Sequence, residues 1–220
     1  MLPVSEVFET MQGEATHTGT PALFVRLQGC AVGCPWCDTK YTWEVDPDRV
    51  VSTGEMLAKL DGSPSYAILD ADELVDLALT YRARLIVFTG GEPCQYDLRE
   101  VTERLLDCGR QVQIETSGTQ EVLCAPSAWV TLSPKIGMPG GFAVRGDAVR
   151  RADEIKMPCG APRDVEKLHA FLAEHGVEDG RRVWLQPLSR SPKATALCIE
   201  AATEHGWRIS VQTHAFIGVR

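Results

Sequence analysis

Short apolar runs alternate with amphipathic stretches beyond the first third of the chain, and this alternation restricts the fold more than any other feature. The runs are short enough for strands, and they cover residues 23–27, 85–88, 112–115, 130–132, 154–157, 183–185 and 209–212. Strands that alternate with helices across short links form parallel sheets with right-handed crossovers. The sequence therefore predicts an α/β fold.

Helix starts and stops fit between these runs. Ser52 with Glu55 makes a capping-box pattern at one start, and Asp72 is placed to cap the next helix. Three further helices are expected to end just before a glycine, over residues 96–108, 162–175 and 192–205. The last two begin with proline, which suits the first turn of a helix.

The length of the chain limits how complete the sheet can be. At 220 residues it is shorter than the roughly 250 residues of an eight-pair barrel, and much of 39–71 carries no strand signal. We expect a single domain over 1–220 that forms an incomplete, TIM-like barrel of about six parallel strands. Chemistry in such sheets collects where strands end. Five strand ends carry polar, glycine-rich or charged segments, at or just after Thr89, Glu115, Ser133, Gln186 and Gln212.

Charge and hydropathy exclude several classes of partner. The net charge is −8 and no long basic run occurs, which argues against a nucleic-acid partner. No apolar run approaches the roughly 20 residues that span a bilayer. The first residues are acidic and lack the basic region of a signal peptide. We therefore expect a cytoplasmic protein with no nucleic-acid and no membrane partner.

Three of the eight cysteines form a cluster, Cys30, Cys34 and Cys37, within GCAVGCPWCDT. The other five are scattered and are interpreted as mostly buried small apolar residues. A zinc-stapled binding module is one reading, but structural zinc takes four protein ligands, so His17 or Cys94 would have to reach in. Three thiolates on a tight loop suit a 4Fe–4S cluster with one iron open. The amino nitrogen and carboxylate of a methionine-type ligand can bind that iron.

The cysteine spacing after a first strand resembles the signature of the radical S-adenosylmethionine (SAM) superfamily. Gly90-Gly91-Glu92-Pro93 resembles the second motif of that superfamily, which holds the SAM amino group. The resemblance narrows to the 7-carboxy-7-deazaguanine synthase family on motifs that keep the order of the family along the chain: Met11-Gln12-Gly13-Glu14, Gly19-Thr20-Pro21, Phe24-Val25-Arg26-Leu27, Cys37-Asp38-Thr39, Ser133-Pro134-Lys135, Gln186-Pro187-Leu188-Ser189 and Gln212-Thr213-His214. Two departures are Ala15, where the family usually has glycine, and the short Cys94-Gln95 segment.

The resemblance implies a radical SAM core and a carbon–nitrogen lyase activity. The implied enzyme converts 6-carboxy-5,6,7,8-tetrahydropterin to 7-carboxy-7-deazaguanine, with loss of ammonia, in queuosine-type 7-deazapurine biosynthesis. Its 4Fe–4S cluster cleaves SAM reductively to a 5′-deoxyadenosyl radical, which takes a substrate hydrogen before the ring contracts. Mg²⁺ at Thr39, an electron donor such as flavodoxin or ferredoxin, and a homodimer are implied as well. A glycyl-radical-enzyme activase is the alternative, because it shares the small size and the three cysteines.

The same resemblance assigns the residues of the site. Those expected at SAM are Trp36, Gly91, Glu92, Ser117, Ser133, Pro134, Lys135, Gln186, Pro187, Leu188 and Ser189. Those expected at the substrate are Met11, Gln12, Gly13, Glu14, Arg26, Thr89, His214 and Arg220. Arg26 can bind the substrate carboxylate as a fork. The apolar residues after His214 favour burial, which would carry the carboxylate of Arg220 inward. Residues 214–220 are expected to be too few for another packed element.

Ordinary structural roles stay open for several of these residues. Glu92 suits the N-terminus of a helix, and Lys135 suits the surface beside a proline- and glycine-rich loop. Arg26 fits an exposed strand position, and Glu14 fits a helix cap. Asp38 and Thr39 fit a cap and a turn, and the last residues fit a frayed end.

Overall fold

The computed structural model describes residues 1–177 and 180–219. In this part the chain forms one nine-stranded sheet in the order β3-β1-β2-β4-β5-β6-β7-β8-β9. The strands are β1 (Leu2–Met11), β2 (Pro21–Leu27), β3 (Ala67–Leu69), β4 (Leu85–Gly90), β5 (Gln111–Thr116), β6 (Trp129–Leu132), β7 (Glu154–Cys159), β8 (Arg182–Pro187) and β9 (Arg208–Ile209). From β2 through β4 to β9 all pairs are parallel, whereas β1 is antiparallel to both neighbours. The sheet is open, with β3 and β9 at its edges.

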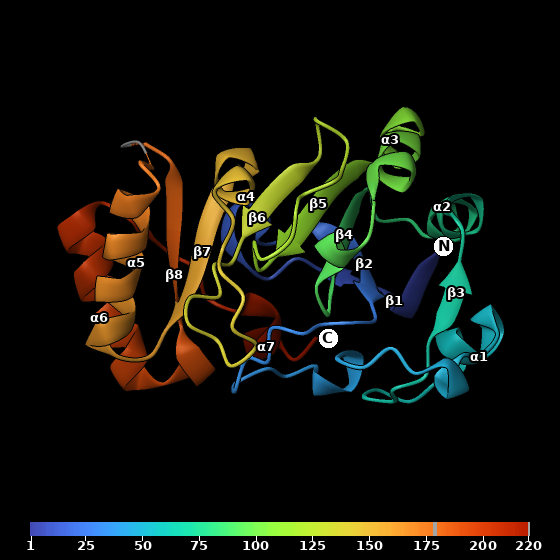
Figure 1. Cartoon of the computed structure of the whole chain (residues 1–220), viewed down its shortest axis with the longest axis horizontal. Coiled ribbons are helices and arrows are strands. Elements are labelled where there is room, and N and C mark those ends of the chain that lie inside the picture. The colour runs from blue at the N-terminus through green and yellow to red at the C-terminus, as the bar shows by residue number, and fades with distance from the viewer. Residues whose placement is uncertain (178–179, 220) are drawn as a thin grey trace.

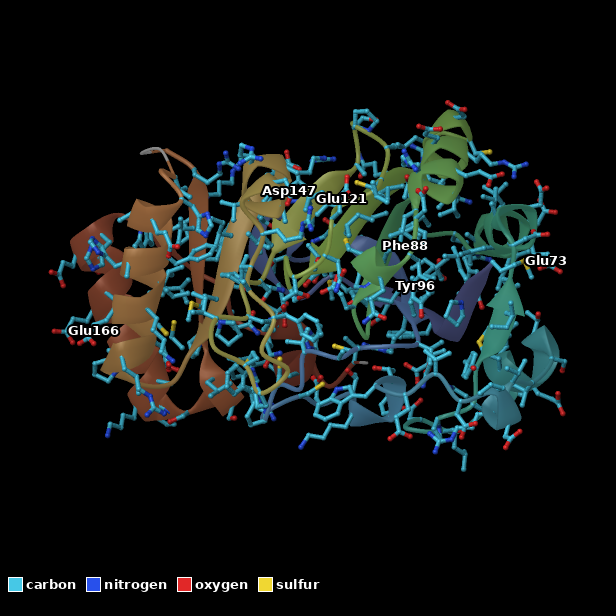
Figure 2. The ribbon with its side chains drawn as sticks, viewed as in Figure 1. Glu73, Phe88, Tyr96, Glu121, Asp147 and Glu166 are labelled. Carbon is cyan, nitrogen blue, oxygen red and sulfur yellow. The ribbon has the colours of Figure 1, made fainter. Side chains whose placement is uncertain are left out.

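Helices pack along the sheet and connect its parallel strands. They are α1 (Thr53–Ala58), α2 (Ala71–Leu79), α3 (Arg99–Asp107), α4 (Gly146–Arg151), α5 (Pro162–Glu174), α6 (Pro192–His205) and α7 (Thr213–Ile217). Figure 1 shows α5 and α6 grouped at one end of the molecule and α1 and α2 at the other, with α7 near the centre. In Figure 2, Glu166 on α5 and Glu73 on α2 point outward at these opposite ends.

The expected α/β fold with a mostly parallel sheet is confirmed, and every strand expected from the sequence is present at least in part. Two antiparallel strands were not expected. The strand β1 lacks a clear alternation because its Ser5 and Glu6 are buried along with its apolar residues. The strand β3 has only three residues, too few to show a pattern. Both add to the β2 side of the sheet, so the parallel part begins at β2 as expected.

Several element boundaries also differ from the expectation. The N-cap of α2 is Asp70 rather than Asp72, because the Asp70 side chain accepts the bond from the Glu73 amide. The helix α3 begins at Arg99, since a short 3-10 turn comes before it. The strand β9 ends at Ile209, and α7 forms where no further element was expected. The short helix α4 was not foreseen either.

The parallel strands turn apolar side chains to one face and mostly polar side chains to the other. The apolar residues join the main core with the helices and include Val25, Phe88, Ile114, Ile155 and Leu185. Their sequence neighbours line a cleft on the opposite face: Arg26, Thr89, Glu115, Lys156 and Gln186. This two-residue period follows from strand geometry. The inner face of the sheet therefore carries charged and amide side chains near the carboxyl ends of its strands.

Candidate active site

Two adjoining cavities open at the carboxyl ends of the parallel strands, with volumes of about 520 Å³ and about 220 Å³. The three clustered cysteines line the larger cavity, and Arg26 and His214 line the smaller one. The residues common to both are Glu14, Asp38, Thr39, Thr89, Gly90, Glu115 and Gln212. Because the cavities share these walls, they form one continuous cleft with two compartments.

The loop that carries the cysteines is held from two sides. The amides of Gly29 and Cys30 donate to the carbonyls of Thr42 (2.7 Å) and Trp43 (3.0 Å). On the other side, the hydroxyl of the half-buried Tyr96, labelled in Figure 2, donates to the Gln28 carbonyl at 2.7 Å. A Cβ at position 29 would lie 2.8 Å from the Tyr96 hydroxyl, so only glycine fits there. The loop is therefore preformed around its thiols.

The three thiols fit the ligand set of an iron–sulfur cluster. All three line the larger cavity, and the Trp43 indole donates to Cys37 Sγ at 3.4 Å. Burial raises the pKa of Cys30 to about 11, and it raises the pKa of Cys34 as well. Among the described residues, no three His, Cys, Asp or Glu side chains lie close enough to hold a single metal ion. A cluster differs in this respect, because each of its thiolates binds a separate iron.

The double glycine after β4 packs directly against the cysteine loop. The Gly91 amide donates to the Leu27 carbonyl at 2.9 Å, and the Glu92 amide donates to the Gly29 carbonyl at 2.8 Å. A Cβ on Gly90 or Gly91 would lie 2.4 Å or less from backbone atoms of these neighbours. Glycine is required here because two backbones touch. The double-glycine motif thus holds the cysteine loop in place and also lines the cleft.

The Glu92 carboxylate is buried and receives three hydrogen bonds. The amides of Cys94 (3.0 Å) and Ser117 (2.7 Å) and the Thr116 hydroxyl (2.6 Å) donate to it. Only the Cys94 bond is a cap of the following 3-10 turn, so the simple reading of Glu92 as a helix N-terminal acid is incomplete. A carboxylate has about four acceptor positions, so one remains for a ligand amine in the cleft.

Ten of the eleven residues expected at SAM line the larger cavity, and Pro134 is the exception. Lys135 is not a surface side chain: it donates to Ser133 Oγ and the Ser133 carbonyl, and burial lowers its pKa. Ser189 and Arg190 both have a φ of 54°, which is unusual for residues other than glycine. Strained backbone of this kind is common at ligand sites.

Arg26 is fixed at the base of the smaller cavity. Its Nε lies 2.9 Å from Glu6 Oε2, and the guanidinium lies over the Phe8 ring, 5.8 Å from the centroid. The Tyr41 hydroxyl donates to the same Glu6 oxygen at 3.1 Å. Only 17% of the Arg26 side chain is exposed. Because Nε binds Glu6, the two terminal nitrogens remain to bind an anion in the cavity.

Opposite Arg26, the cleft carries a cluster of carboxylates and amides around Lys156. The Lys156 ammonium forms ion pairs with Glu14 and with Glu115, the latter at 2.7 Å. The amides of Gln186 (3.2 Å) and Gln212 (2.9 Å) donate to Glu14 Oε1. Burial opposes ionisation of Glu14, but the charge and hydrogen bond of Lys156, the Gln212 hydrogen bond and the nearby His214 together outweigh it and lower the pKa of Glu14 to about 2. Glu14 is thus an ionised acceptor rather than a helix cap, and it has no capping hydrogen bond.

Sequence reasoning did not assign Glu115, Lys156 and Gln212 to the site. Glu115 and Gln212 stand at strand ends that the sequence did mark as polar. Lys156 gives a weaker signal: it is a lysine inside an otherwise apolar strand, where a charge is expected only if it is paired. Its partners come from segments far away in the chain, so no local pattern reveals them.

The C-terminal helix α7 meets the Gln-Gly-Glu motif. The Thr213 amide and hydroxyl both donate to the Gly13 carbonyl, at 3.0 and 3.1 Å. A Cβ on Gly13 would lie 2.1 Å from His214 Nδ1, so the two segments touch. The expected burial of the last apolar residues is wrong, since Phe216 is 67% exposed and Ile217 is 56% exposed. The expectation for Arg220 falls outside the described residues.

Seven of the eight residues expected at the substrate thus lie at or beside the smaller cavity. Met11, Gln12, Glu14, Arg26, Thr89 and His214 line it, and Gly13 contacts His214. Ala15, which departs from the family pattern, has a φ of 53°. That conformation favours glycine. Alanine is held there by a bond from its amide to the Ser210 hydroxyl, 2.9 Å long.

Comparisons with known proteins agree with this geometry. The model of the radical SAM superfamily matches residues 24–133. The chain is 48% identical over 219 residues to 7-carboxy-7-deazaguanine synthase from Escherichia coli strain K12, which covers 99% of this chain and 98% of the relative. It is 37% identical to the enzyme of that name from Buchnera aphidicola subsp. Schizaphis graminum, with 99% of both chains covered. The crystal structure of QueE from Escherichia coli matches with a TM-score of 0.91 and 47% identity, over 96% of this chain and 93% of that one.

Proposed function

The chain belongs to the 7-carboxy-7-deazaguanine synthase family of radical SAM enzymes, and from this premise we propose how its cleft carries out the reaction. The enzyme converts 6-carboxy-5,6,7,8-tetrahydropterin to 7-carboxy-7-deazaguanine with loss of ammonia, in queuosine-type 7-deazapurine biosynthesis. It uses a 4Fe–4S cluster and SAM. The observation that carries the proposal is the continuity of the two cavities: the thiols open into the compartment that adjoins Arg26 and Glu14.

In the larger compartment, Cys30, Cys34 and Cys37 would hold the cluster. The bound cluster would supply the electron for reductive cleavage of SAM, which starts the radical chemistry on the substrate. Gly91 and Glu92 would bind the SAM amino group, and the half-buried Lys135 would bind its carboxylate. The other lining residues expected at SAM would surround the adenosine: Trp36, Ser117, Ser133, Gln186, Pro187, Leu188 and Ser189.

In the smaller compartment, the chain would bind the pterin by its two ends. The terminal nitrogens of Arg26 would bind the substrate carboxylate, because Glu6 already orients the guanidinium. Glu14 and Glu115 would accept hydrogen bonds from the amino-pyrimidine edge, with His214 nearby. Thr89 lies between the two compartments, where the reacting atoms would meet. The protein thereby orients the substrate and keeps water from the radical.

Thr39 would bind Mg²⁺ together with the substrate carboxylate. The Thr39 hydroxyl lies 3.5 Å from Cys37 Sγ, and both Thr39 and Asp38 line both compartments. Mg²⁺ takes few protein oxygens and keeps several waters, which this sparse donor set suits. Rates and carboxypterin affinity should both fall in EDTA and return with added Mg²⁺. Equal rates in the two conditions would remove the metal from the mechanism.

Further parts of the proposal concern the surroundings of the enzyme. The radical SAM reaction needs a reductant, and we propose a small electron carrier such as flavodoxin or ferredoxin. All eight cysteines are free thiols, which fits a reducing, cytoplasmic location. In the part of the chain with described coordinates, no helix has the length and hydropathy to cross a membrane. We also propose that residues 1–220 form one domain, which one sheet from β1 to β9 supports, and that the protein is a homodimer.

Turnover tests the function directly. The enzyme, reconstituted with iron and sulfide without oxygen, is mixed with the carboxypterin, SAM and a reductant. We expect 7-carboxy-7-deazaguanine and ammonia in equal amounts. If the iron-loaded enzyme cleaves SAM but forms no deazaguanine, the assignment of the substrate is wrong.

A further inference from the structure

Lys156 is a buried cation at the centre of the cleft, and neither the sequence motifs nor the proposed mechanism uses it. It lies in the middle of β7, and only 4% of its side chain is exposed. Its ammonium contacts one carboxylate on each side, Glu14 after β1 and Glu115 on β5. Both carboxylates line both compartments of the cleft. A lysine in this position therefore sets the position of two carboxylates that face a ligand in the cleft.

The charges around Lys156 leave the cluster with a net charge of −1 when all three groups are ionised. Other ionisable groups line the same cleft: Lys135 after β6, Arg26 on β2, Glu92 after β4, Arg190 after β8, His214 on α7, and Asp38 with the three cysteines in the cysteine loop. On β7 itself, Glu154 faces the same side below Lys156 and is bound by the Trp129 and Trp184 indoles. The neighbouring strand β8 contributes the neutral Gln186. No second cation among the described residues forms an ion pair with Glu14 or Glu115.

Neutral side chains complete the bonding of the two carboxylates. The Gln12 amide donates to Glu115 Oε1 at 3.0 Å, and its own oxygen accepts the Glu14 amide at 3.1 Å. Gln113 also donates to Glu115 Oε1, at 3.4 Å. Among the described residues, every hydrogen-bond partner of the two carboxylates is therefore a donor. Each carboxylate still has acceptor capacity left toward the cleft.

We propose that Lys156 is a positioning residue that holds the Glu14 and Glu115 carboxylates in place and keeps Glu14 ionised, so that this wall of the cleft offers only acceptors to the ligand. The inference rests on the proposed function, because it concerns the same compartment. A wall of acceptors selects a ligand edge with several N–H donors, such as an amino-pyrimidinone. It rejects an edge that presents acceptors at the same positions, since these would lie unpaired against carboxylate oxygens.

The protonation of Glu14 should depend on Lys156. In the wild type, burial raises the pKa of Glu14, but the Lys156 ammonium, together with the Gln212 hydrogen bond and His214, outweighs burial and holds the pKa at about 2. Without the ammonium, burial and the neighbouring Glu115 carboxylate raise the pKa of Glu14. Glu14 then binds a proton at a higher pH than in the wild type. A protonated carboxyl presents a donor to the ligand where an acceptor is needed, so affinity falls as the pH falls.

The test compares Lys156→Gln with the wild type as holoenzymes. The glutamine keeps a neutral donor between the carboxylates and removes the charge. Affinity for the carboxypterin is measured from about pH 6 to about pH 8.5, and infrared spectra follow the carbonyl stretch of protonated carboxyl groups. We expect the wild-type advantage to grow about tenfold for each pH unit below the raised pKa of the variant. A new protonated-carboxyl band should titrate over the same pH range.

Matched variants separate this role from a merely structural one. The double variant Glu115→Gln/Lys156→Gln restores the net charge of −1 and removes the like charge beside Glu14. The loss of affinity at low pH and the infrared band should therefore both move to lower pH than in Lys156→Gln. Lys167→Gln, on the exposed side of α5, should change neither. If Lys156→Gln fails to fold, Lys156→Met, which also removes the charge, replaces it in the same measurements.

Two outcomes would overturn the proposal. One is a constant loss of affinity at every pH, and the other is the absence of a new infrared band. The infrared titration needs no substrate. A wild-type enzyme that makes no deazaguanine would therefore count against the proposed function alone.

Discussion

The eight cysteines occupy three kinds of surroundings, and these predict different consequences of substitution. Cys30, Cys34 and Cys37 share one cleft, on a loop held by backbone bonds. Cys198 is buried in the helical layer, where it packs in the main core. Cys108 ends α3 and is exposed. Only the first group can bind iron together. Substitutions in that group should therefore affect iron content and product formation, whereas substitutions of Cys198 or Cys108 should affect at most the unfolding free energy.

Replacing Cys34 with Ala should abolish product formation and remove most of the iron, because a cluster with two protein thiolates is poorly held. Iron and sulfide analysis and product assays measure both effects. Cys198→Ala should keep its iron and lose about 1 kcal/mol of unfolding free energy. Cys108→Ala should match the wild type within about 0.5 kcal/mol. If a scattered cysteine proves as important for iron as Cys34, the ligand assignment is wrong.

At the scale of elements, the start of α2 shows how a cap is decided by geometry. Asp70 Oδ1 accepts the Glu73 amide and Glu73 Oε2 accepts the Asp70 amide, both at 2.9 Å. Asp72, two residues later, is already in the first turn and pairs with Arg104 on α3. Both aspartates follow β3 and suit a helix start by composition. Only the backbone conformation distinguishes the cap, and Asp70 is the extended residue with φ of −83° and ψ of −179°.

The two positions should therefore differ in stability. Asp70→Ala removes the cap from the Glu73 amide and should lower the unfolding free energy by about 1 kcal/mol. Asp72→Ala loses an exposed ion pair and should cost less than about 0.5 kcal/mol. Urea denaturation of each variant measures the difference. Equal losses, or a larger loss at Asp72, would contradict the capping geometry.

At the scale of the whole molecule, the segment after β1 and the C-terminal helix α7 meet at the substrate compartment. The Gln-Gly-Glu segment after β1 contacts α7 through Gly13, Thr213 and His214. Arg190 stabilises the same region, since it donates to the Ala215 carbonyl at 3.2 Å and lies over the Phe216 ring. The C-terminal segment is thus a short helix attached to the site, not a frayed end.

An extension after Arg220 should therefore disturb the substrate compartment while leaving the cluster intact. We expect a non-cleavable C-terminal His-tag, and separately the deletion of Arg220, to raise the KM for the carboxypterin. Iron content and SAM binding should stay normal, because the cysteine loop lies in the other compartment. The same tag at Met1 is the control. Unchanged kinetics in both C-terminal variants would show that the terminus does not contribute to the site.

The sequence by itself determined the features that short-range chemistry specifies. The parallel strands, the glycine and proline helix ends and the clustering of the three cysteines follow from local periodicity, turn chemistry and motif spacing. These signals are local because backbone conformation and side-chain alternation act over a few residues. Most of the other lining residues were expected from the resemblance to the family.

Only the tertiary structure decided the features that depend on distant partners. The strand β1 shows no alternation of apolar and polar residues that could predict it, because Glu6 is buried by its pairing with Arg26. The last apolar residues form α7 and stay exposed, although their composition favours burial. Lys156 becomes part of the site only because Glu14, 142 positions away, and Glu115, 41 positions away, fold against it. A buried charge is stable only beside its counter-charge, and that neighbour is set by the packing of the whole sheet.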